Sequence, residues 1–142
     1  QPWGHQLSDG VLTPLDPELK PDNPPLMGPA GTVNMRLEDY ARFVHMFLTG
    51  GVGVLTPETV TRLTTAPPGA GRPYGFGWLV SPQPLWAQGP VLMHEGSNTL
   101  WHATTLIDPT GGLGVIALSN DNSRGGPATQ QLAQRLIAAH TG

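Results

Sequence analysis

The sequence has 142 residues, a length that suits one domain with a real hydrophobic core. Its net charge is −3 and its basic residues are scattered, which argues against nucleic acid or an anionic membrane surface as a partner. It contains no cysteine, so disulfides, thiolate catalysis and cysteine-ligated metals are excluded.

The sequence contains few signals of where the protein is located. No apolar run is long enough to span a bilayer, and the first residues have neither the basic nor the apolar region of a signal peptide. The sequence does not begin with Met, which suggests a start inside a longer protein. The lack of cysteine favours an extracytoplasmic location, periplasmic or secreted, although a cytoplasmic location stays open.

Residues 1–33 are rich in proline and show no sustained hydrophobic period. We therefore expect an extended, irregular segment here. Its apolar residues, among them Trp3, Leu7 and Leu26, favour a segment that drapes over structure outside this chain rather than a free linker.

Residues 34–70 are expected to be the helical part of the chain. Apolar residues recur at three- and four-residue steps over residues 37–48 and predict an amphipathic helix, which Gly50-Gly51 would end. A shorter helix is predicted over residues 56–65, with Thr56 as its N-cap.

Residues 74–142 are expected to hold the sheet strands and the C-terminal helix, which begins at Pro127. A hairpin turn is predicted over residues 108–112. The predicted strands span residues 74–80, 90–94, 101–108 and 113–118. The last of these is almost wholly apolar, as expected for a central strand covered on both faces. Strands joined by short turns and followed by a helix indicate an α+β fold, an antiparallel sheet flanked by helices.

The most chemically varied stretch is His94-Glu95-Gly96-Ser97-Asn98-Thr99-Leu100-Trp101. It lies where one predicted strand ends and the next begins, a common place for a binding or catalytic rim. The Gly-Ser-Asn within it is also typical of an ordinary tight connection, so that interpretation stands beside the functional one.

The sequence holds no activated serine motif. None of its serines stands in G-x-S-x-G or three residues before a lysine, and no Tyr or Ser stands two residues before an Asn. A dyad of Ser97 with His94 or His102 is an alternative, although neighbouring residues of one strand rarely point at each other.

We expect neither a metal site nor a cofactor. The histidines form no HExxH motif and no closely spaced pair. The stretch Gly111-Gly112-Leu113-Gly114 lacks the Lys and the strand–loop–helix context of a phosphate-binding loop.

Several segments in chain order together resemble one family. They are Pro29-Ala30-Gly31-Thr32-Val33 with residues 37–43, Leu55-Thr56-Pro57-Glu58-Thr59, Tyr74-Gly75-Phe76-Gly77-Trp78, His94-Glu95-Gly96-Ser97 and residues 114–120. The pattern resembles the serine β-lactamase and penicillin-binding-protein superfamily, closest to its β-lactamase-related esterase and peptidase branch. The resemblance runs from about Gly4 to Ile137.

The resemblance implies an antiparallel sheet with helices on both faces and catalysis through an acyl-enzyme. The nucleophile of the family is the Ser of S-x-x-K, assisted by Y-x-N, and both motifs are absent from this sequence. The chain therefore looks like the C-terminal portion of one β-lactamase-like domain and is expected to be inactive alone. Its implied partners are the N-terminal part of the same enzyme and a small-molecule or peptide acyl substrate.

By the same resemblance, His94-Glu95-Gly96 falls on the third motif of the family, Lys-Thr-Gly or His-x-Gly. His94, Gly96 and Ser97 then take catalytic positions, with the backbone N–H at Ser97 in the oxyanion site. The substrate-binding residues would be Glu95, Asn98 and Trp101. Glu95 departs from the small hydroxyl residue common at its position, which favours ester or peptide substrates over β-lactams.

Two other interpretations stay open at this point. One is a non-catalytic binding or scaffolding module with the same fold. The other is an unrelated α+β domain.

Overall fold

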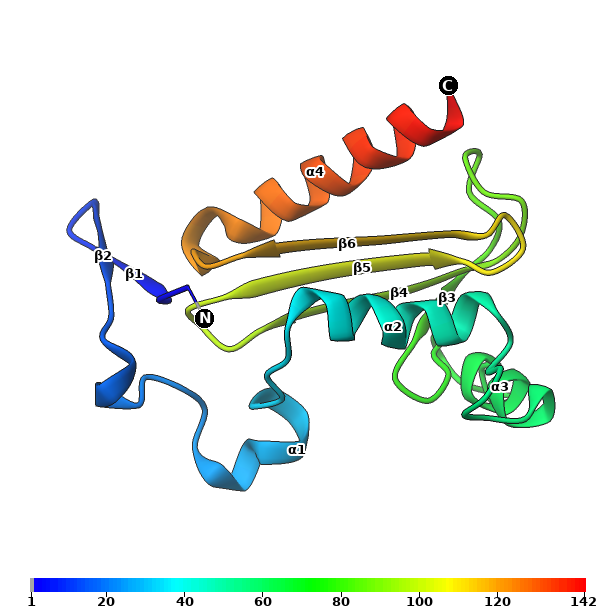
Figure 1. Ribbon diagram of the computed structural model, residues 1–142, viewed down its shortest axis with the longest axis horizontal. Helices are drawn as coiled ribbons and strands as arrows, with labels where there is room; N and C mark the ends of the chain where they lie inside the picture. The colour runs from blue at the N-terminus through cyan, green and yellow to red at the C-terminus, as the bar shows by residue number, and fades with distance from the viewer. Residues whose placement is uncertain (1) are drawn as a thin grey trace. The chain divides into compact units, whose positions relative to one another are not determined.

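The computed structural model describes residues 2–142, apart from the side chain of Asn122. Its largest sheet has four strands in the order β3-β4-β5-β6 (Figure 1). They are Leu79–Ser81, Val91–Ser97, His102–Asp108 and Leu113–Ser119. Sheet neighbours follow one another along the chain, and β3 pairs with β4 antiparallel. The predicted α+β fold, an antiparallel sheet with helices, is confirmed.

The chain divides into two compact units, and the strands β4, β5 and β6 each have residues in both. Unit 1 comprises Gln1–Asn34, Glu95–Thr104 and Ala117–Arg135. Unit 2 comprises Met35–His94, Thr105–Ile116 and Leu136–Gly142.

The core of unit 2 forms around helix α2 (Leu37–Leu48), whose bounds agree with the predicted helix. The helix buries Val44 and Phe47 on one face. The buried cluster also contains Trp78, Leu92 and Ile107. The rings of Phe47 and Trp78 meet edge to face with centroids 5.0 Å apart, an arrangement that aromatic pairs prefer. The helical period of apolar residues therefore predicts both the helix and the face that it buries.

Two contacts show how closely α2 packs on strand residues within unit 2. A Cβ at Gly114 would lie 2.7 Å from a methyl carbon of Val44, so a side chain there would push the helix away. The hydroxyls of Tyr40 and Thr105 are hydrogen-bonded at 2.5 Å. This bond satisfies a threonine that is only 1% exposed. The close packing of α2 therefore explains why a glycine stands at position 114 in an otherwise apolar strand.

Among the described residues β6 is hydrogen-bonded to β5 alone, so its predicted central position stays a prediction. The strand comes last in the sheet order, and Leu118 is 49% exposed although Val115 and Ala117 are buried. An apolar run reports how far side chains are withdrawn from water. It does not report how many hydrogen-bonded neighbours the strand has, so it could not place β6 in the order.

Helix α3 (Pro57–Thr64) lies within the predicted range and begins where its sequence signals indicate. The hydroxyl of Thr56 accepts the backbone N–H of Thr59 at 3.3 Å, as expected of an N-cap. The loop after the helix packs against its last turn at Gly75. A Cβ at that position would lie 2.6 Å from the carbonyl oxygen of Leu63, so glycine is required for this approach.

The strand predicted over residues 74–80 is much shorter in the structure, where β3 begins only at Leu79. Gly77 has a φ of +88°, which interrupts an extended chain. Tyr74 then pairs back with Leu79 in an isolated antiparallel bridge. The alternation of aromatic residues with glycine therefore marks a tight turn here rather than the predicted strand.

The hairpin turn predicted over residues 108–112 is confirmed, and a buried carboxylate holds it. Asp108 is 2% exposed. Its oxygens accept backbone N–H groups from Gln88 at 2.8 Å, Gly111 at 2.9 Å and Thr110 at 3.1 Å. A buried carboxylate without such donors would be costly, so these bonds explain how the charge is tolerated between two strands.

The proline-rich segment of unit 1 holds more regular structure than predicted. Strands β1 (His5–Ser8) and β2 (Val11–Pro14) form an antiparallel hairpin, and short helical turns follow, among them α1 (Gly28–Gly31). Asp9 and Gly10 at the tip have φ values of 49° and 79°, the positive pair that a type I′ turn needs. The Asp-Gly dipeptide is the sequence signal for this hairpin.

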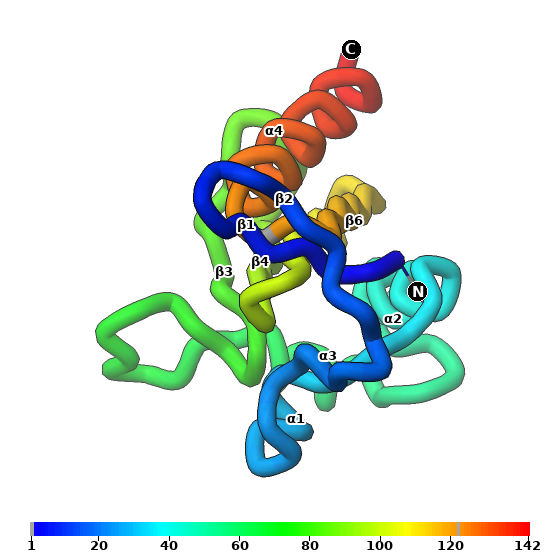
Figure 2. Tube along the Cα trace, turned by 90° about the vertical axis from the view of Figure 1, so that its left-hand side faces the viewer, coloured from blue at the N-terminus to red at the C-terminus, as the bar shows by residue number. Residues whose placement is uncertain are grey.

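Within unit 1 the hairpin lies beside the end of β6 and the beginning of helix α4 (Asn122–Thr141), as Figure 2 shows. The backbone N–H of His5 donates to the carbonyl oxygen of Asn120 at 2.9 Å. The side-chain amide of Asn120 donates to the carbonyl oxygen of Trp3 at 2.9 Å. The start of the segment predicted to drape over structure outside this chain is therefore held by residues of the chain itself.

Helix α4 begins at Asn122 and not at Pro127, which lies inside it. Asp121 explains the early start, because its carboxylate accepts the backbone N–H of Ser123 at 2.8 Å and also the hydroxyl of that residue. No helix of residues 2–142 is long and apolar enough to cross a membrane.

The pKa of Asp121 lies below its ordinary value of 3.8, chiefly because the hydroxyl of Ser123 donates to the carboxylate. Its charged form therefore contributes stability above 3.8, and this contribution is lost as the pH falls through the lowered pKa. We expect Asp121→Asn to lower the melting temperature at neutral pH, with the difference from wild type vanishing in strong acid. Circular dichroism melts at a series of pH values measure this, and a difference that does not vary with pH would contradict it.

Candidate functional site

The predicted site residues lie on β4 and in the turn after it. The structure moves the boundary between the two, because β4 continues to Ser97 and contains the whole of His94-Glu95-Gly96-Ser97. Gly96 has no positive φ and does not interrupt the strand. The turn comes later, where Ser97 Oγ accepts the N–H of Thr99 at 3.0 Å and Thr99 has a φ of +76°.

Within the part of the chain that the structure describes, the pairing of β4 with β3 stops short of the candidate residues. Strand β3 has 3 residues, and they pair with Val91, Leu92 and Met93. Its pairing therefore ends before His94. The residues from His94 to Ser97 are exposed, and a Cβ at Gly96 would meet no described atom within 4 Å. An extended, peptide-like ligand can add to such a strand edge.

His94 belongs to unit 2, where its exposed ring rests on the core. The imidazole packs edge to face against Trp78, with centroids 6.3 Å apart and ring planes at 89°. Trp78 is 5% exposed and is itself fixed by Phe47. The core thus orients the imidazole of His94 while leaving it accessible to a ligand.

Glu95, in unit 1, has protein partners. Its Oε1 accepts the amide N–H of Gln130 at 2.9 Å and the hydroxyl of Thr104 at 3.2 Å. These residues lie on α4 and β5. The contacts show that this carboxylate is held by neighbouring elements, and its predicted role in substrate binding stays a prediction.

The side chains of Asn98 and Trp101 also make contacts within unit 1. Asn98 Oδ1 accepts the backbone N–H of Trp101 at 3.2 Å and closes the turn after β4. Asn98 Nδ2 donates to a carboxylate oxygen of Asp22 at 2.7 Å. The indole N–H of Trp101 donates to the carbonyl oxygen of Pro2 at 3.2 Å. Both side chains tie the turn to the N-terminal segment, and their predicted contact with substrate stays untested.

The alternative dyad of Ser97 with His102 does not form among the described residues of unit 1. Ser97 Oγ accepts from the turn at Thr99, and His102 Nδ1 lies 3.0 Å from the hydroxyl of Thr129. Each side chain therefore has a different partner.

Sequence reasoning missed the polar pair behind Glu95. Thr104 and Thr129 are 3% and 2% exposed, and their hydroxyls lie 2.8 Å apart. Threonine is common in strands, so its type carries no functional signal. The only usable hint is spacing, because His102 and Thr104 are two residues apart on β5 and share a face of the sheet.

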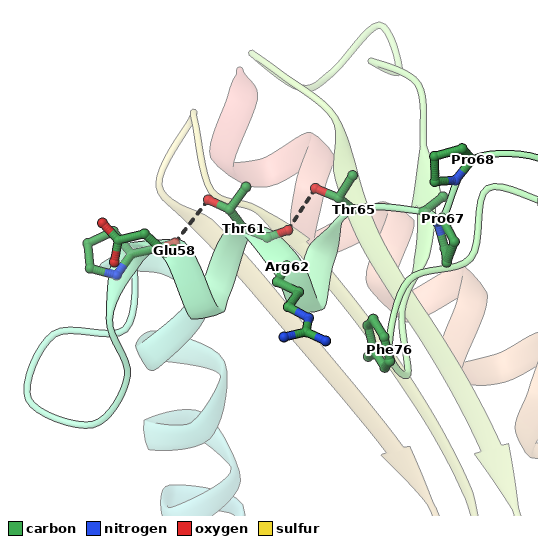
Figure 3. Close-up of a pocket in the computed structure, with 9 residues that line it drawn as sticks. Glu58, Thr61, Arg62, Thr65, Pro67, Pro68 and Phe76 are labelled. Atoms are coloured by element: carbon green, nitrogen blue, oxygen red, sulfur yellow. Dashed lines mark hydrogen bonds between the residues drawn. The ribbon is translucent and has the colours of Figure 1, made fainter.

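No group of three or more His, Cys, Asp or Glu residues that could hold a metal ion occurs within residues 2–142. Unit 2 has a hollow of about 630 Å³ between α3 and the loop that follows it (Figure 3). Its walls include Arg62, Pro67, Pro68 and Phe76, and none of the predicted site residues lines it.

Comparison with known proteins decides the family. The family model described as Beta-lactamase matches residues 1–140. The chain belongs to the Beta-lactamase family. A similar solved structure is that of the octameric penicillin-binding protein homologue from Pyrococcus abyssi. The TM-score is 0.68 at 19% identity, over 96% of this chain and 30% of that chain. None of the curated proteins compared with the chain matches it.

This Beta-lactamase-family chain thus spans 30% of the length of that homologue, and at 19% identity the likeness shows a common fold alone. The resemblance to the serine β-lactamase and penicillin-binding-protein superfamily, which is a superfamily of hydrolases, is confirmed. The alternative of an unrelated α+β domain is wrong.

Proposed function

We propose that this chain is the C-terminal part of a serine hydrolase that cleaves an ester, amide or β-lactam through an acyl-enzyme. The nucleophile belongs to an S-x-x-K segment outside these 142 residues. The observation that supports the proposal best is that β4 extends beyond its pairing with β3 at His94-Glu95-Gly96-Ser97, in a chain of the Beta-lactamase family.

In the proposed reaction the nucleophilic serine attacks the substrate carbonyl carbon, and the bond from that carbon to the alcohol oxygen or amine nitrogen breaks. The alcohol or amine takes up a proton and leaves, except in a β-lactam, where the amine stays attached in the opened ring. Water then cleaves the acyl-enzyme and restores the serine. The backbone N–H of Ser97 donates to the oxyanion, together with the backbone N–H of the nucleophile. Gly96 offers no side chain on the approach to the strand, so an acyl group can lie along β4.

His94 provides electrostatic support to the reacting centre in this scheme. It takes the place of the cationic or hydrogen-bonding residue of the third motif, and its ring is accessible and oriented by Trp78. Because Glu95, Asn98 and Trp101 have protein partners, we assign the first contacts with substrate to His94 and to the β4 backbone.

A non-catalytic binding module is the second candidate. It would use the same exposed residues of β4 and needs no S-x-x-K segment elsewhere in the protein. The two candidates differ in a single test, which is covalent labelling of a protein that carries these 142 residues together with an S-x-x-K segment. The proposed hydrolase is labelled by a fluorophosphonate at the serine of that segment. A protein that carries both and stays unlabelled would be a binding module.

The 142-residue chain alone should form no covalent adduct with a fluorophosphonate or a penicillin, because none of its serines is activated. Intact-protein mass spectrometry should show no added mass under conditions that fully label a penicillin-binding protein. Stoichiometric labelling at Ser97 would overturn the expectation and revive a dyad within this chain.

A further inference from the structure

A series of hydrogen bonds in unit 1 leads from Glu95 on the exposed strand to the imidazole of His102. Glu95 Oε1 accepts from Thr104 at 3.2 Å, the hydroxyls of Thr104 and Thr129 lie 2.8 Å apart, and Thr129 Oγ1 lies 3.0 Å from His102 Nδ1. Gln130 donates a second hydrogen bond to Glu95 Oε1 at 2.9 Å. We call these five residues the Glu95–His102 network.

The middle of the Glu95–His102 network is buried and its Glu95 end is exposed. Thr104 is 3% and Thr129 is 2% exposed. A buried hydroxyl without a partner is costly, and no buried side-chain polar atom of the described residues lacks one. The two threonines therefore depend on each other and on the groups at either end.

Counting protons gives the network one direction. A carboxylate can only accept, so Thr104 gives its single hydroxyl proton to Glu95. The bond between the two threonines then needs the proton of Thr129. The carbonyl oxygen of Gly126, 3.0 Å from Thr129 Oγ1, shares this same proton. With the protons of both threonines used in this way, His102 Nδ1 is the donor, and the neutral imidazole is held as its Nδ1–H tautomer.

The beginning of α4 leaves room for this imidazole. A Cβ at Gly125 would lie 3.2 Å from Cβ of His102 and 2.9 Å from Oγ of Ser119. A Cβ at Gly126 would lie 3.5 Å from Nε2 of His102. Two adjacent glycines are unfavourable inside a helix. Here Gly125 lets α4 approach His102 closely enough for Thr129 to reach Nδ1, whereas 3.5 Å at Gly126 is an ordinary van der Waals distance.

We infer that Glu95 is a positioning residue, held by this network, that fixes the backbone of Gly96 and Ser97. Consecutive side chains of a strand point to opposite faces, so Glu95 can be anchored to Thr104 and Gln130 while the other face at Gly96 stays open. The catalytic consequence rests on the proposed function, in which the N–H of Ser97 binds the oxyanion. The tautomer of His102 follows from the direction of the hydroxyl protons and does not depend on the proposed function.

Nitrogen NMR of ¹⁵N-histidine-labelled protein carrying these 142 residues tests the network directly. At a pH where His102 is neutral, its Nδ1 should show the protonated shift and its Nε2 the unprotonated shift. Thr129→Val removes the acceptor and should abolish this preference, whereas Thr129→Ser keeps the hydroxyl and should retain it. The exposed His45 and His140 are internal references. An Nε2–H tautomer of His102 in the wild type would overturn the inference.

Kinetics of the same variants test the positioning role in an active protein. Glu95→Ala and Thr129→Val should each lower kcat by about 10- to 100-fold, the size of effect expected from a misplacement near 1 Å. KM should change by less than about twofold, and Thr129→Ser should restore kcat. A raised KM with unchanged kcat in Glu95→Ala would mean that Glu95 contacts the substrate directly, and would overturn the inference.

Amide hydrogen exchange separates the inference from the proposed function. The backbone N–H groups of β4 that pair with β5 near Glu95 should exchange faster in Glu95→Ala than in the wild type, whether or not the protein is a hydrolase. If exchange rises as expected but no acyl-enzyme forms in a protein with an S-x-x-K segment, the proposed function is wrong and the anchoring of β4 by Glu95 stands. Unchanged exchange would overturn the anchoring itself.

Discussion

Replacing His94 with alanine should lower the turnover of a protein that carries both these residues and an S-x-x-K segment by roughly a hundred- to a thousandfold. Removing one preorganised group at a reacting centre costs about 2.7–4 kcal/mol of transition-state stabilisation. The ring of His94 is preorganised because it rests edge to face on the buried Trp78, so little reorganisation is needed during the reaction. Steady-state kcat and KM with an ester substrate measure the effect.

A histidine elsewhere in the same unit provides the matched control. His45 is exposed on α2, so His45→Ala should retain wild-type turnover. Both variants should keep the wild-type melting temperature, since both side chains are exposed. Full activity of His94→Ala would show that the third motif is misplaced, and a rise in KM alone would show that His94 only binds substrate.

The helices could be predicted from the sequence because their signals are local. The apolar stripe over residues 37–48 and the cap at Thr56 depend on residues within a few positions of each other. Neither needs knowledge of the rest of the fold. The order of short motifs was also enough to indicate the family, although no one motif was strict.

Two of the errors in the predicted strands involve glycine. The sequence pattern placed Gly75 and Gly77 within a strand and Gly96 in a tight connection. The structure reverses both assignments, since Gly77 has a positive φ and Gly96 does not. Gly75 is required by a carbonyl oxygen of α3, a contact between elements that local spacing cannot reveal.

The partners of the candidate site residues could not be predicted for a similar reason. Asn98 bonds to Asp22, and the indole of Trp101 bonds to Pro2, across 76 and 99 residues of chain. Glu95 bonds to Gln130 across 35 residues. The position of a side chain along a strand indicates which face it lies on, but the residue opposite is decided by how the chain folds back.

The largest loss of stability is expected at Ile107, whose side chain is 0% exposed in the core of unit 2. Ile107→Ala should lower the free energy of unfolding by about 2–5 kcal/mol, because transfer free energy is lost and a cavity remains. Ile107→Val removes a single carbon and should cost about 0.5–1.5 kcal/mol. Urea unfolding of the protein that carries these residues gives both values.

An exposed aliphatic residue of the same unit separates cavity formation from a general effect of truncation. Leu85 is fully exposed, so Leu85→Ala should change the free energy of unfolding by less than about 0.5 kcal/mol. The loss in the free energy of unfolding should therefore be largest for Ile107→Ala, smaller for Ile107→Val and smallest for Leu85→Ala. This order follows from burial alone. If Ile107→Ala costs no more than Leu85→Ala, the cluster of Ile107 with Trp78 is not the core of unit 2. Trp78 would then not be held rigidly enough to orient the ring of His94.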